Sequence, residues 1–275
     1  MLSHLFGLMF RLSPDLKRPV YRNLYEYLSG RYRDMDWPFM NYGLADLDGN
    51  TPRLPLQRAD EHHRYQIQLY HHVTRVADLR DRRVLEVSCG RGGGASYVMR
   101  YLRPRAVAGV DFSRQAIEFC ARHYRIPGLS FVAAEAEALP FGAQTFDGVI
   151  NVESSHCYGS MERFLDEVCR VLRPQGYLFF ADIRRRHELP ALHQQLRRSG
   201  LTIVHEETIT ANVLRALDLD STRKHALIEQ WVPPLFRQAT ENFVRLRGTP
   251  AYEALREGRT AYVHYVARNE ARRRS

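Results

Sequence analysis

The stretch from Arg83 to Tyr97, Arg-Val-Leu-Glu-Val-Ser-Cys-Gly-Arg-Gly-Gly-Gly-Ala-Ser-Tyr, constrains the fold of this chain more than any other. It begins with a short apolar, β-favouring run interrupted by one carboxylate, Glu86, which is typical of a buried strand. The four glycines that follow permit tight turning, positive φ angles and close approach of the backbone to a ligand. Apolar residues at helical spacing come next. The stretch therefore predicts a strand, a glycine turn and a helix N-terminus that together form a nucleotide-sized pocket.

Strands and helices alternate from this turn onward. Besides strand 83–88, we expect strands at 106–111, 129–133, 146–152, 177–182, 201–205 and 262–267. We expect helices at 93–102, 113–124, 160–172 and 188–199, with Ser113 as an N-cap and Arg173-Pro-Gln-Gly176 as a stop. This rhythm predicts an α/β fold with a Rossmann-like, doubly wound, seven-stranded and mostly parallel sheet.

The flanking segments break the rhythm. Residues 1–80 show no strand alternation and are interpreted as an N-terminal helical lid, in which the aromatic, turn-prone stretch Phe39–Gly43 is a candidate to fold over a site. Residues 208–258 are interpreted as a helical insertion that completes a cap over the ligand-binding domain, residues 81–207 and 259–270. Trp231 and the stretch Pro233–Phe236 suit an apolar roof of the pocket, although ordinary packing within the cap explains them equally well.

Charge and composition narrow the class of protein. The chain has 275 residues and a formal net charge of +9, but its basic residues are dispersed, which favours a solvated basic surface over a nucleic-acid groove. Four cysteines form no CxxC pair. We expect no metal site, because a group of histidines has no obvious carboxylate partner. That group is His62, His63, His71 and His72.

The N-terminal segment bears on location. Residues 1–12 are apolar but lack a charged start and a small-residue cleavage pattern, which disfavours a signal peptide. No stretch reaches membrane-spanning length. We expect a cytoplasmic protein, a monomer or a homodimer, in which residues 1–12 form a lid helix or alternatively touch a membrane surface.

The glycine turn is compatible with two nucleotide cofactors. The pattern Gly90-x-Gly-x-x-Ala95 satisfies the dinucleotide fingerprint, and Asp111, about twenty residues later, can bind a ribose in either case. Glu86 favours S-adenosylmethionine, because a carboxylate ahead of the first glycine attracts its positively charged methionyl end and repels a pyrophosphate. An acidic, apolar loop around Glu135 suits the adenine amine and ring.

Five stretches carry a resemblance to a known family: VLEVSCGRGGGASYVMRYL, GVDFS, FVAAEAEALPF, TFDGVINVESSHCY and FLDEVCRVLRPQGYLFFADIR. Together they are similar to class I S-adenosylmethionine-dependent methyltransferases. Within that superfamily they most resemble the phthiotriolone/phenolphthiotriolone dimycocerosate methyltransferases and related O-methyltransferases of polyketides and lipids. The resemblance covers about Leu54 to Asn269 and includes the helix around Tyr70. It implies O-methylation of a hydroxyl on a hydrophobic small molecule.

The resemblance also implies cofactor-binding roles for single residues, grouped by the part of the cofactor. These are Tyr70, Glu86, Ser88, Cys89, Gly90 and Gly92 at the methionyl part, Asp111 at the ribose, Phe112, Glu135 and Ala136 at the adenine, and Asn151 beneath the sulfonium. Relatives usually carry Gly-Asp-Ala where this chain has Ala134-Glu-Ala136, so the longer acid changes the adenine contact.

The loop after the fourth strand is expected to carry the chemistry, because open α/β sheets bind ligands at the carboxyl ends of their strands. His156 is the candidate base, since imidazole titrates near neutrality; the alternative is a histidine that fixes the loop. Asp182, at the end of the fifth strand, would orient His156 or bind the acceptor hydroxyl, or else cap the next helix. Glu153 would bridge cofactor and loop, or order the turn.

Other functions stay open on the sequence alone. They are methylation of carbon or nitrogen, methylation of nucleic acid, nicotinamide-dependent oxidation, and cofactor binding without catalysis. The chain has no Asn/Asp-Pro-Pro-Tyr motif, which argues against nucleic acid. The sequence does not name the acceptor.

Overall fold

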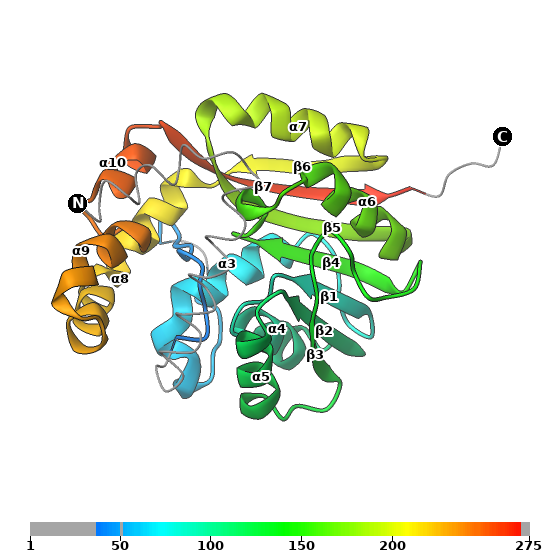
Figure 1. Ribbon diagram of the computed structural model, residues 1–275, viewed down its shortest axis with the longest axis horizontal. Helices are drawn as coiled ribbons and strands as arrows, with labels where there is room; N and C mark the ends of the chain where they lie inside the picture. Colours follow the sequence, from blue (N-terminus) through cyan, green and yellow to red (C-terminus); the bar gives the residue numbers. More distant parts are fainter. Residues whose placement is uncertain (1–36, 50–51, 271–275) are drawn as a thin grey trace.

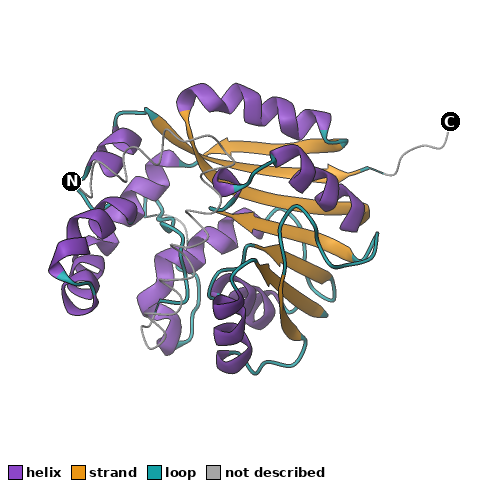
Figure 2. Cartoon of the chain, in the orientation of Figure 1, coloured by secondary structure: helices purple, strands orange, loops and turns teal. Residues whose placement is uncertain are grey.

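The computed structural model describes residues 37–49 and 52–270. One seven-stranded sheet runs through this part of the chain, with helices packed on both of its faces (Figures 1 and 2). The strands are β1 (Arg83–Val87), β2 (Ala106–Asp111), β3 (Leu129–Ala133), β4 (Phe146–Val152), β5 (Leu172–Arg185), β6 (Leu201–Thr208) and β7 (Thr260–Asn269). Their order is β3-β2-β1-β4-β5-β7-β6. Only β7 runs antiparallel to its neighbours, so the prediction of a mostly parallel, Rossmann-like sheet is confirmed.

Helices connect these strands. The α-helices are α3 (Arg64–Thr74), α4 (Gly93–Tyr97), α5 (Arg114–His123), α6 (Met161–Val171), α7 (Leu189–Arg198), α8 (Thr210–Trp231), α9 (Pro234–Phe243) and α10 (Pro250–Arg256). Short turns of other helix types are η1 (Arg58–His63), η2 (Val98–Leu102), η3 (Ser155–Cys157) and η4 (Arg186–Glu188). Among the described residues, no helix is both long and apolar enough to span a bilayer.

The helices form for local reasons that the sequence already indicates. Ser113 caps α5 by accepting a hydrogen bond from the Ala116 amide at 3.2 Å, as predicted. Ser160 caps α6 in the same way. The apolar residues of α6 recur at helical spacing and are buried against one face of the sheet with α7, whereas α3, α4 and α8 contribute to the core on the other face.

Strands β5, β6 and β7 extend beyond their predicted ranges, and two further differences concern the helix 93–102 and the start of β5. The predicted helix 93–102 divides into α4 and a π-helical turn, η2. The stretch Arg173–Gly176 was predicted to separate a helix from a strand, but it lies within β5, which begins at Leu172. Gln175 takes a positive φ of 66° there, and the pairing of β4 with β5 shifts register between Phe146 and Gly148. A tight, turn-like stretch is thereby accommodated as an irregularity at the start of the strand.

The sheet topology positions the site. Strands β1 and β4 are neighbours at the centre, and connections leave them on opposite sides of the sheet order, to β2 and to β5. Open α/β sheets bind ligands at such a switch point, outside the carboxyl ends of the strands. The glycine turn after β1 and the loop after β4 meet at this edge.

Candidate active site

The glycine turn after β1 is held to the end of β2 by Asp111. One carboxylate oxygen of Asp111 accepts a hydrogen bond from the Gly90 amide at 2.9 Å, and the other accepts one from the Ser113 amide at 2.9 Å. Ser88 and Gly90 have φ angles of 61° and 52°. A serine in this left-handed region is strained, and such strain gathers at ligand sites. The turn is therefore fixed in the conformation that exposes its backbone.

Tyr70 and the segment before Asn41 pack directly on this turn. A Cβ atom on Gly94 would lie 2.2 Å from Cζ of Tyr70 and 2.4 Å from Oε1 of Glu86. A Cβ on Gly93 would lie 2.6 Å from the carbonyl oxygen of Pro38, which accepts a hydrogen bond from the Gly93 amide. Any side chain at either glycine would displace these neighbours, so here the glycines serve close packing.

A cleft opens at the carboxyl ends of β1, β2 and β4. It encloses about 1150 Å³, part of it open to solvent, which matches the size of ligand pockets. Of the residues assigned to the site, the cleft is lined by Tyr70, Ser88, Cys89, Gly90, Asp111, Phe112, Glu135, Ala136 and Glu153. Lining residues that had no assigned role include Pro38, Ser113, Ala116, Glu137, Val152, Ser154, Cys157 and Tyr158. Phe39, Met40 and Asn41 of the stretch expected to fold over a site also line it.

Glu86 lies behind the cleft wall, not in it. Its side chain is buried, and the Tyr70 hydroxyl donates to its Oε1 at 2.6 Å. Among the described residues, Oε2 of Glu86 has no hydrogen-bond partner. Burial raises the pKa of Glu86 to about 8. A cation in the cleft would stabilise the ionised form of Glu86.

Gly92 and Asn151, which were also assigned to the cofactor, do not line the cleft. Gly92 has a φ of 77°, and a Cβ on it would meet Tyr124, Cys120 and Phe131. Nδ2 of Asn151 lies 3.2 Å from the Val87 carbonyl oxygen and also within hydrogen-bonding distance of Ser154 and Tyr158. Gly92 allows close packing behind the glycine turn, and Asn151 forms hydrogen bonds between the ends of β1 and β4.

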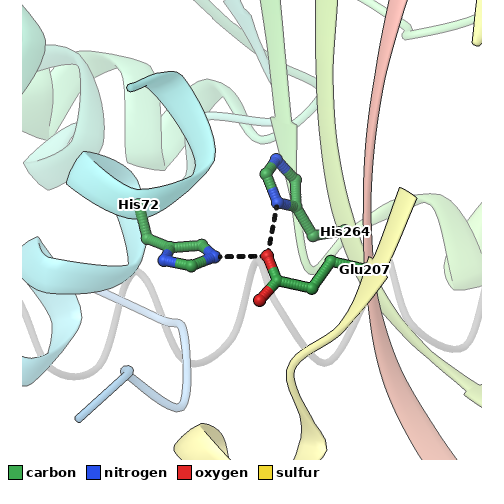
Figure 3. Close-up of side chains that lie close together, drawn as sticks. All are labelled: His72, Glu207 and His264. Carbon is green, nitrogen blue, oxygen red and sulfur yellow. Dashed lines mark hydrogen bonds and ion pairs between the residues drawn. The ribbon is translucent and has the colours of Figure 1, made fainter. Parts of the chain in front are cut away.

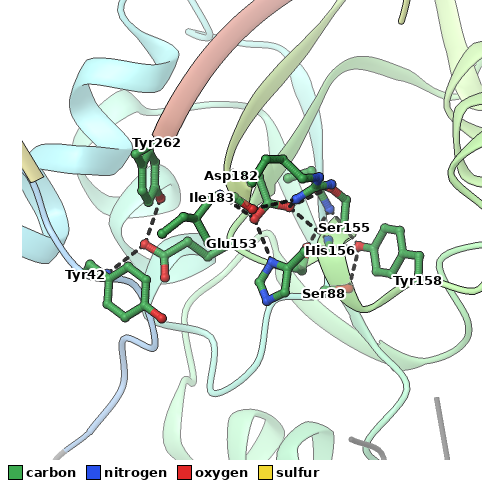
Figure 4. A network of polar contacts seen from close by, with 12 residues as sticks. Tyr42, Ser88, Glu153, Ser155, His156, Tyr158, Asp182, Ile183 and Tyr262 are labelled. Carbon is green, nitrogen blue, oxygen red and sulfur yellow. Dashed lines mark hydrogen bonds and ion pairs between the residues drawn. The ribbon is translucent and has the colours of Figure 1, made fainter. Parts of the chain in front are cut away.

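Glu153 connects distant parts of the chain at the end of β4. Its Oε1 accepts hydrogen bonds from the Tyr42 amide at 2.8 Å and from the Tyr262 hydroxyl at 2.7 Å (Figure 4). Its φ of 51° is strained for a residue with a Cβ. Burial raises the pKa of Glu153 to about 7. The carboxyl group thus orders both the turn and the segment that covers the cleft.

His156 and Asp182 form a hydrogen-bonded pair, called here the dyad. Nδ1 of His156 lies 2.7 Å from Oδ1 of Asp182, which turns the other ring nitrogen, Nε2, away from Asp182 (Figure 4). The side chain of His156 is 32% exposed, whereas that of Asp182 is fully buried. His156 is not among the residues that line the cleft, but it stands in the same loop as its lining neighbours Ser154 and Cys157.

The surroundings of Asp182 keep it ionised. Oδ2 of Asp182 contacts the Arg184 guanidinium at 2.8 Å and accepts hydrogen bonds from the Ser155 hydroxyl at 2.6 Å and the His156 amide at 3.1 Å. Burial alone would raise the pKa of Asp182, but Arg184 and His156 hold it well below its usual range. These contacts agree with the role of Asp182 in orienting His156. The N-cap residue of the next helical turn, η4, is Arg185 and not Asp182.

The dyad changes the pKa of His156. Burial acts to lower it, while the neighbouring Cys157 sulfur and the Asp182 carboxylate raise it well above its usual value. An imidazole held in this way accepts a proton strongly and keeps a fixed tautomer. This arrangement suits a general base at the edge of a ligand cleft.

The residues for which the sequence left an apolar roof and ordinary packing open lie outside the cleft lining. Trp231, Leu235 and Phe236 are 38%, 73% and 39% exposed, and neither they nor Pro233 and Pro234 line the cleft. They lie at the junction of α8 and α9, away from the carboxyl ends of β1 and β4 (Figure 1). The candidate lid helix at residues 1–12 falls outside the described residues.

Comparisons with known proteins agree with this geometry. A family model described as a methyltransferase domain matches residues 85–180. The chain is 38% identical over 257 residues to a fatty-acid O-methyltransferase of Mycolicibacterium smegmatis, covering 93% of this chain and 92% of that protein. It is 42% identical over 212 residues to a phthiotriol/phenolphthiotriol dimycocerosates methyltransferase of Mycobacterium tuberculosis, covering 77% and 78%.

Solved structures share the fold at low sequence identity. One is a geranyl diphosphate C-methyltransferase from Streptomyces coelicolor A3(2), in complex with S-adenosyl-L-homocysteine. Its TM-score is 0.62 at 18% identity, and the alignment covers 89% of this chain and 98% of that one. At this identity the likeness concerns the fold, whereas the sequence relatives above carry the family.

Proposed function

Because the chain belongs to the S-adenosylmethionine-dependent methyltransferases, in the family of the fatty-acid and dimycocerosates methyltransferases, we propose that it methylates an oxygen atom of a hydrophobic, lipid- or polyketide-type acceptor. The cofactor supplies a methyl group already activated on a sulfonium. The protein therefore has to align the acceptor and remove its proton.

The cleft fits that cofactor. Tyr70, backed by the buried Glu86, offers a negative environment to the cationic methionyl part. Asp111 keeps acceptor capacity for ribose hydroxyls while holding the glycine turn. Glu135 and Phe112 line the part of the cleft that we assign to adenine. These assignments are supported by position in the cleft, since nine of the predicted residues meet there.

The dyad is the observation that carries oxygen methylation of a hydroxyl. An alcohol, with a pKa close to the roughly 16 of water, needs a base before it attacks a methyl group. Nε2 of His156 would accept that proton, and Asp182 would orient the ring and stabilise the imidazolium. Pre-organised groups of this kind contribute about 10²–10⁴-fold to rate.

A second acceptor class is a fatty-acid carboxylate. It is favoured by the similarity to the fatty-acid O-methyltransferase, of which the alignment covers 92%. A carboxyl group is already ionised at neutral pH and needs no base. The two classes therefore differ in their dependence on His156. The buried, fully paired Asp182 favours the hydroxyl class, because such an arrangement has no use for an acceptor that carries no proton.

The test compares two acceptors in His156→Ala. A long-chain alcohol or diol and a long-chain fatty acid are each incubated with labelled cofactor, and the products are identified by mass. We expect turnover of the hydroxylated acceptor to fall about 10²–10⁴-fold with cofactor affinity unchanged. His193→Ala, which alters a half-buried histidine paired with Glu206, is the control and keeps full activity.

Three outcomes bear against this proposal. Full turnover of the hydroxylated acceptor by His156→Ala would show that His156 is not the general base. Methylation of the fatty acid alone would assign the second class. A methyl group on carbon or nitrogen in the product would assign the reaction to another type of methyltransferase.

Further parts of the proposal concern partners and location. We propose that the chain acts without nucleic acid, in the cytoplasm, as a monomer or homodimer, and that residues 1–12 can contact a membrane surface. Light scattering tests the oligomeric state, and sedimentation with anionic vesicles tests the membrane contact against a chain lacking residues 1–12. Activity that is insensitive to salt and to added nucleic acid supports a small-molecule acceptor.

A further inference from the structure

A second group of histidines and a carboxylate lies apart from the cleft lining. His72 is on α3, Glu207 is near the end of β6, and His264 is on β7 (Figure 3). Nε2 of His72 lies 2.9 Å from Oε2 of Glu207, and Nδ1 of His264 lies 3.8 Å from the same oxygen. Glu207 and His264 are paired across β6 and β7. We call these three residues the histidine cluster.

His264 presents a lone pair to this carboxylate. The residue is fully buried, and its Nε2 lies 3.2 Å from the carbonyl oxygen of Val73, which can only accept a hydrogen bond. Nε2 therefore carries the proton, and Nδ1 is unprotonated in the neutral ring. Within the described part of the chain, Nδ1 has no hydrogen-bond partner. A buried lone pair facing a carboxylate oxygen is costly unless a cation lies between them.

The same arrangement is common around metal ions. A metal-ligating histidine usually donates its other N–H to a carbonyl or carboxylate, which fixes the tautomer and the ring. The candidate ligand atoms of His72, Glu207 and His264 all lie within 4.8 Å of one another. Ligands at 2.0–2.1 Å in a tetrahedral zinc site are roughly 3.3 Å apart. Small side-chain rotations would bring the cluster to that spacing.

We propose that His72, Glu207 and His264 bind a divalent cation of the zinc type. Two imidazoles and one carboxylate are a ligand set that zinc accepts and that magnesium and calcium, which prefer oxygen, do not. His205 lies beside the cluster, with its Nε2 3.3 Å from Oε2 of Glu207, but it does not share the mutual spacing of the three ligands.

The position of the cluster indicates a structural role. It joins α3 to β6 and β7, and α3 also carries Tyr70, which lines the cleft two residues before His72. None of the three ligands lines the cleft. The ion would therefore hold α3 and its tyrosine against the sheet and would take no part in methyl transfer.

Zinc titration of the full, chelator-treated chain tests the site. Isothermal titration calorimetry is expected to show saturable binding of one Zn²⁺, and Zn²⁺ is expected to raise the thermal unfolding temperature. Mg²⁺ should do neither. His264→Phe, which keeps the ring volume, and Glu207→Gln should each weaken Zn²⁺ binding at least tenfold and remove the thermal shift.

His193→Ala is the matched control. His193 pairs with Glu206 at 3.2 Å, and Glu206 lies on the opposite face of β6 from Glu207, so this variant removes a histidine beside a glutamate without touching the cluster. It should bind Zn²⁺ as the wild type does. Glu207→Gln keeps the proposal testable if His264→Phe folds poorly. Absence of stoichiometric Zn²⁺ binding, or binding unchanged in both variants, would overturn the proposal.

Discussion

The dyad and the histidine cluster are built from the same residue types and have opposite electrostatics. In the dyad, one buried carboxylate, Asp182, holds one histidine and also contacts Arg184. In the cluster, one carboxylate, Glu207, has its Oε2 within 4 Å of three histidines, and its side chain is 34% exposed. The pKa of His156 is raised well above its usual value, whereas the pKa of His264 is lowered to about 3.

The comparison shows which factors set the pKa of a histidine beside a carboxylate. Asp182 is completely enclosed and kept ionised, so its full charge acts on the ring of His156 through a 2.7 Å contact. His264 is buried at 3.8 Å from a carboxylate shared with other histidines, so desolvation outweighs attraction. The first arrangement is suited to accept a proton, and the second keeps a lone pair available for a cation.

The largest effect is expected from Asp182→Asn. Removing the charge leaves His156 without the group that stabilises its protonated form, so kcat for a hydroxylated acceptor should fall about 10²–10⁴-fold. Steady-state kinetics with a long-chain alcohol measures this, and calorimetry with S-adenosylhomocysteine should show unchanged affinity.

Asp166→Asn is the control for that variant, because Asp166 is exposed on α6 and lies outside the cleft. Asp182→Asn also removes the ionic partner of Arg184, so the folding of this variant must be verified by circular dichroism. If a folded Asp182→Asn enzyme keeps its kcat, the contrast between the two histidine sites has no catalytic meaning.

The second prediction concerns pH. Only the neutral form of His156 can accept a proton, and its pKa is raised, so kcat/KM for a hydroxylated acceptor should fall as pH drops through a value above the ordinary 6.5 of histidine. In Asp182→Asn the pKa of His156 should move down, and the acidic limb should move to lower pH.

Nuclear magnetic resonance of the imidazole signals measures the same pKa without relying on residual activity. The His156 signal is identified by its loss in His156→Ala. A His156 pKa that is the same with aspartate and asparagine at position 182 would contradict the assigned electrostatics.

The smallest effect is expected from Glu207→Gln in the presence of a chelator. Glu207 is about a third exposed, and partly exposed ion pairs contribute about 0–1 kcal/mol, so the free energy of unfolding should hardly change. Asp182→Asn breaks a largely buried pair and should cost about 3–5 kcal/mol. Urea denaturation of both variants measures the difference. Equal losses would show that the two carboxylates are equivalent in the folded protein.

Much of the fold could be predicted, because each strand has a local signature. Short apolar, β-favouring runs mark β1 to β4 within a residue of their observed ends, and Ser113 marks the start of α5. The irregular start of β5 could not be predicted, since Arg173–Gly176 has the composition of a turn and pairs with β4 only through a register shift. Such pairing depends on neighbouring strands and not on local sequence.

The sites were predictable to different degrees. His156 follows β4, and Asp182 lies near the end of the neighbouring strand β5, so their proximity is a consequence of the sheet order. Glu207 and His72 are 135 positions apart and meet because α3 packs beside β7. The carboxylate beside the histidines of α3 could not be predicted, because Glu207 comes from a distant part of the sequence.

Strand β7 links Glu153, which lines the cleft, to the histidine cluster through its alternation of side chains. Tyr262 and His264 lie two residues apart and therefore on the same face, where one donates to Glu153 and the other belongs to the cluster. Insertion or deletion of one residue ahead of Tyr262 within β7 would turn both to the opposite face. A change of chain length within β7 would therefore disturb both groups of contacts at once, whereas the loops that join α8, α9 and α10 lie outside this strand.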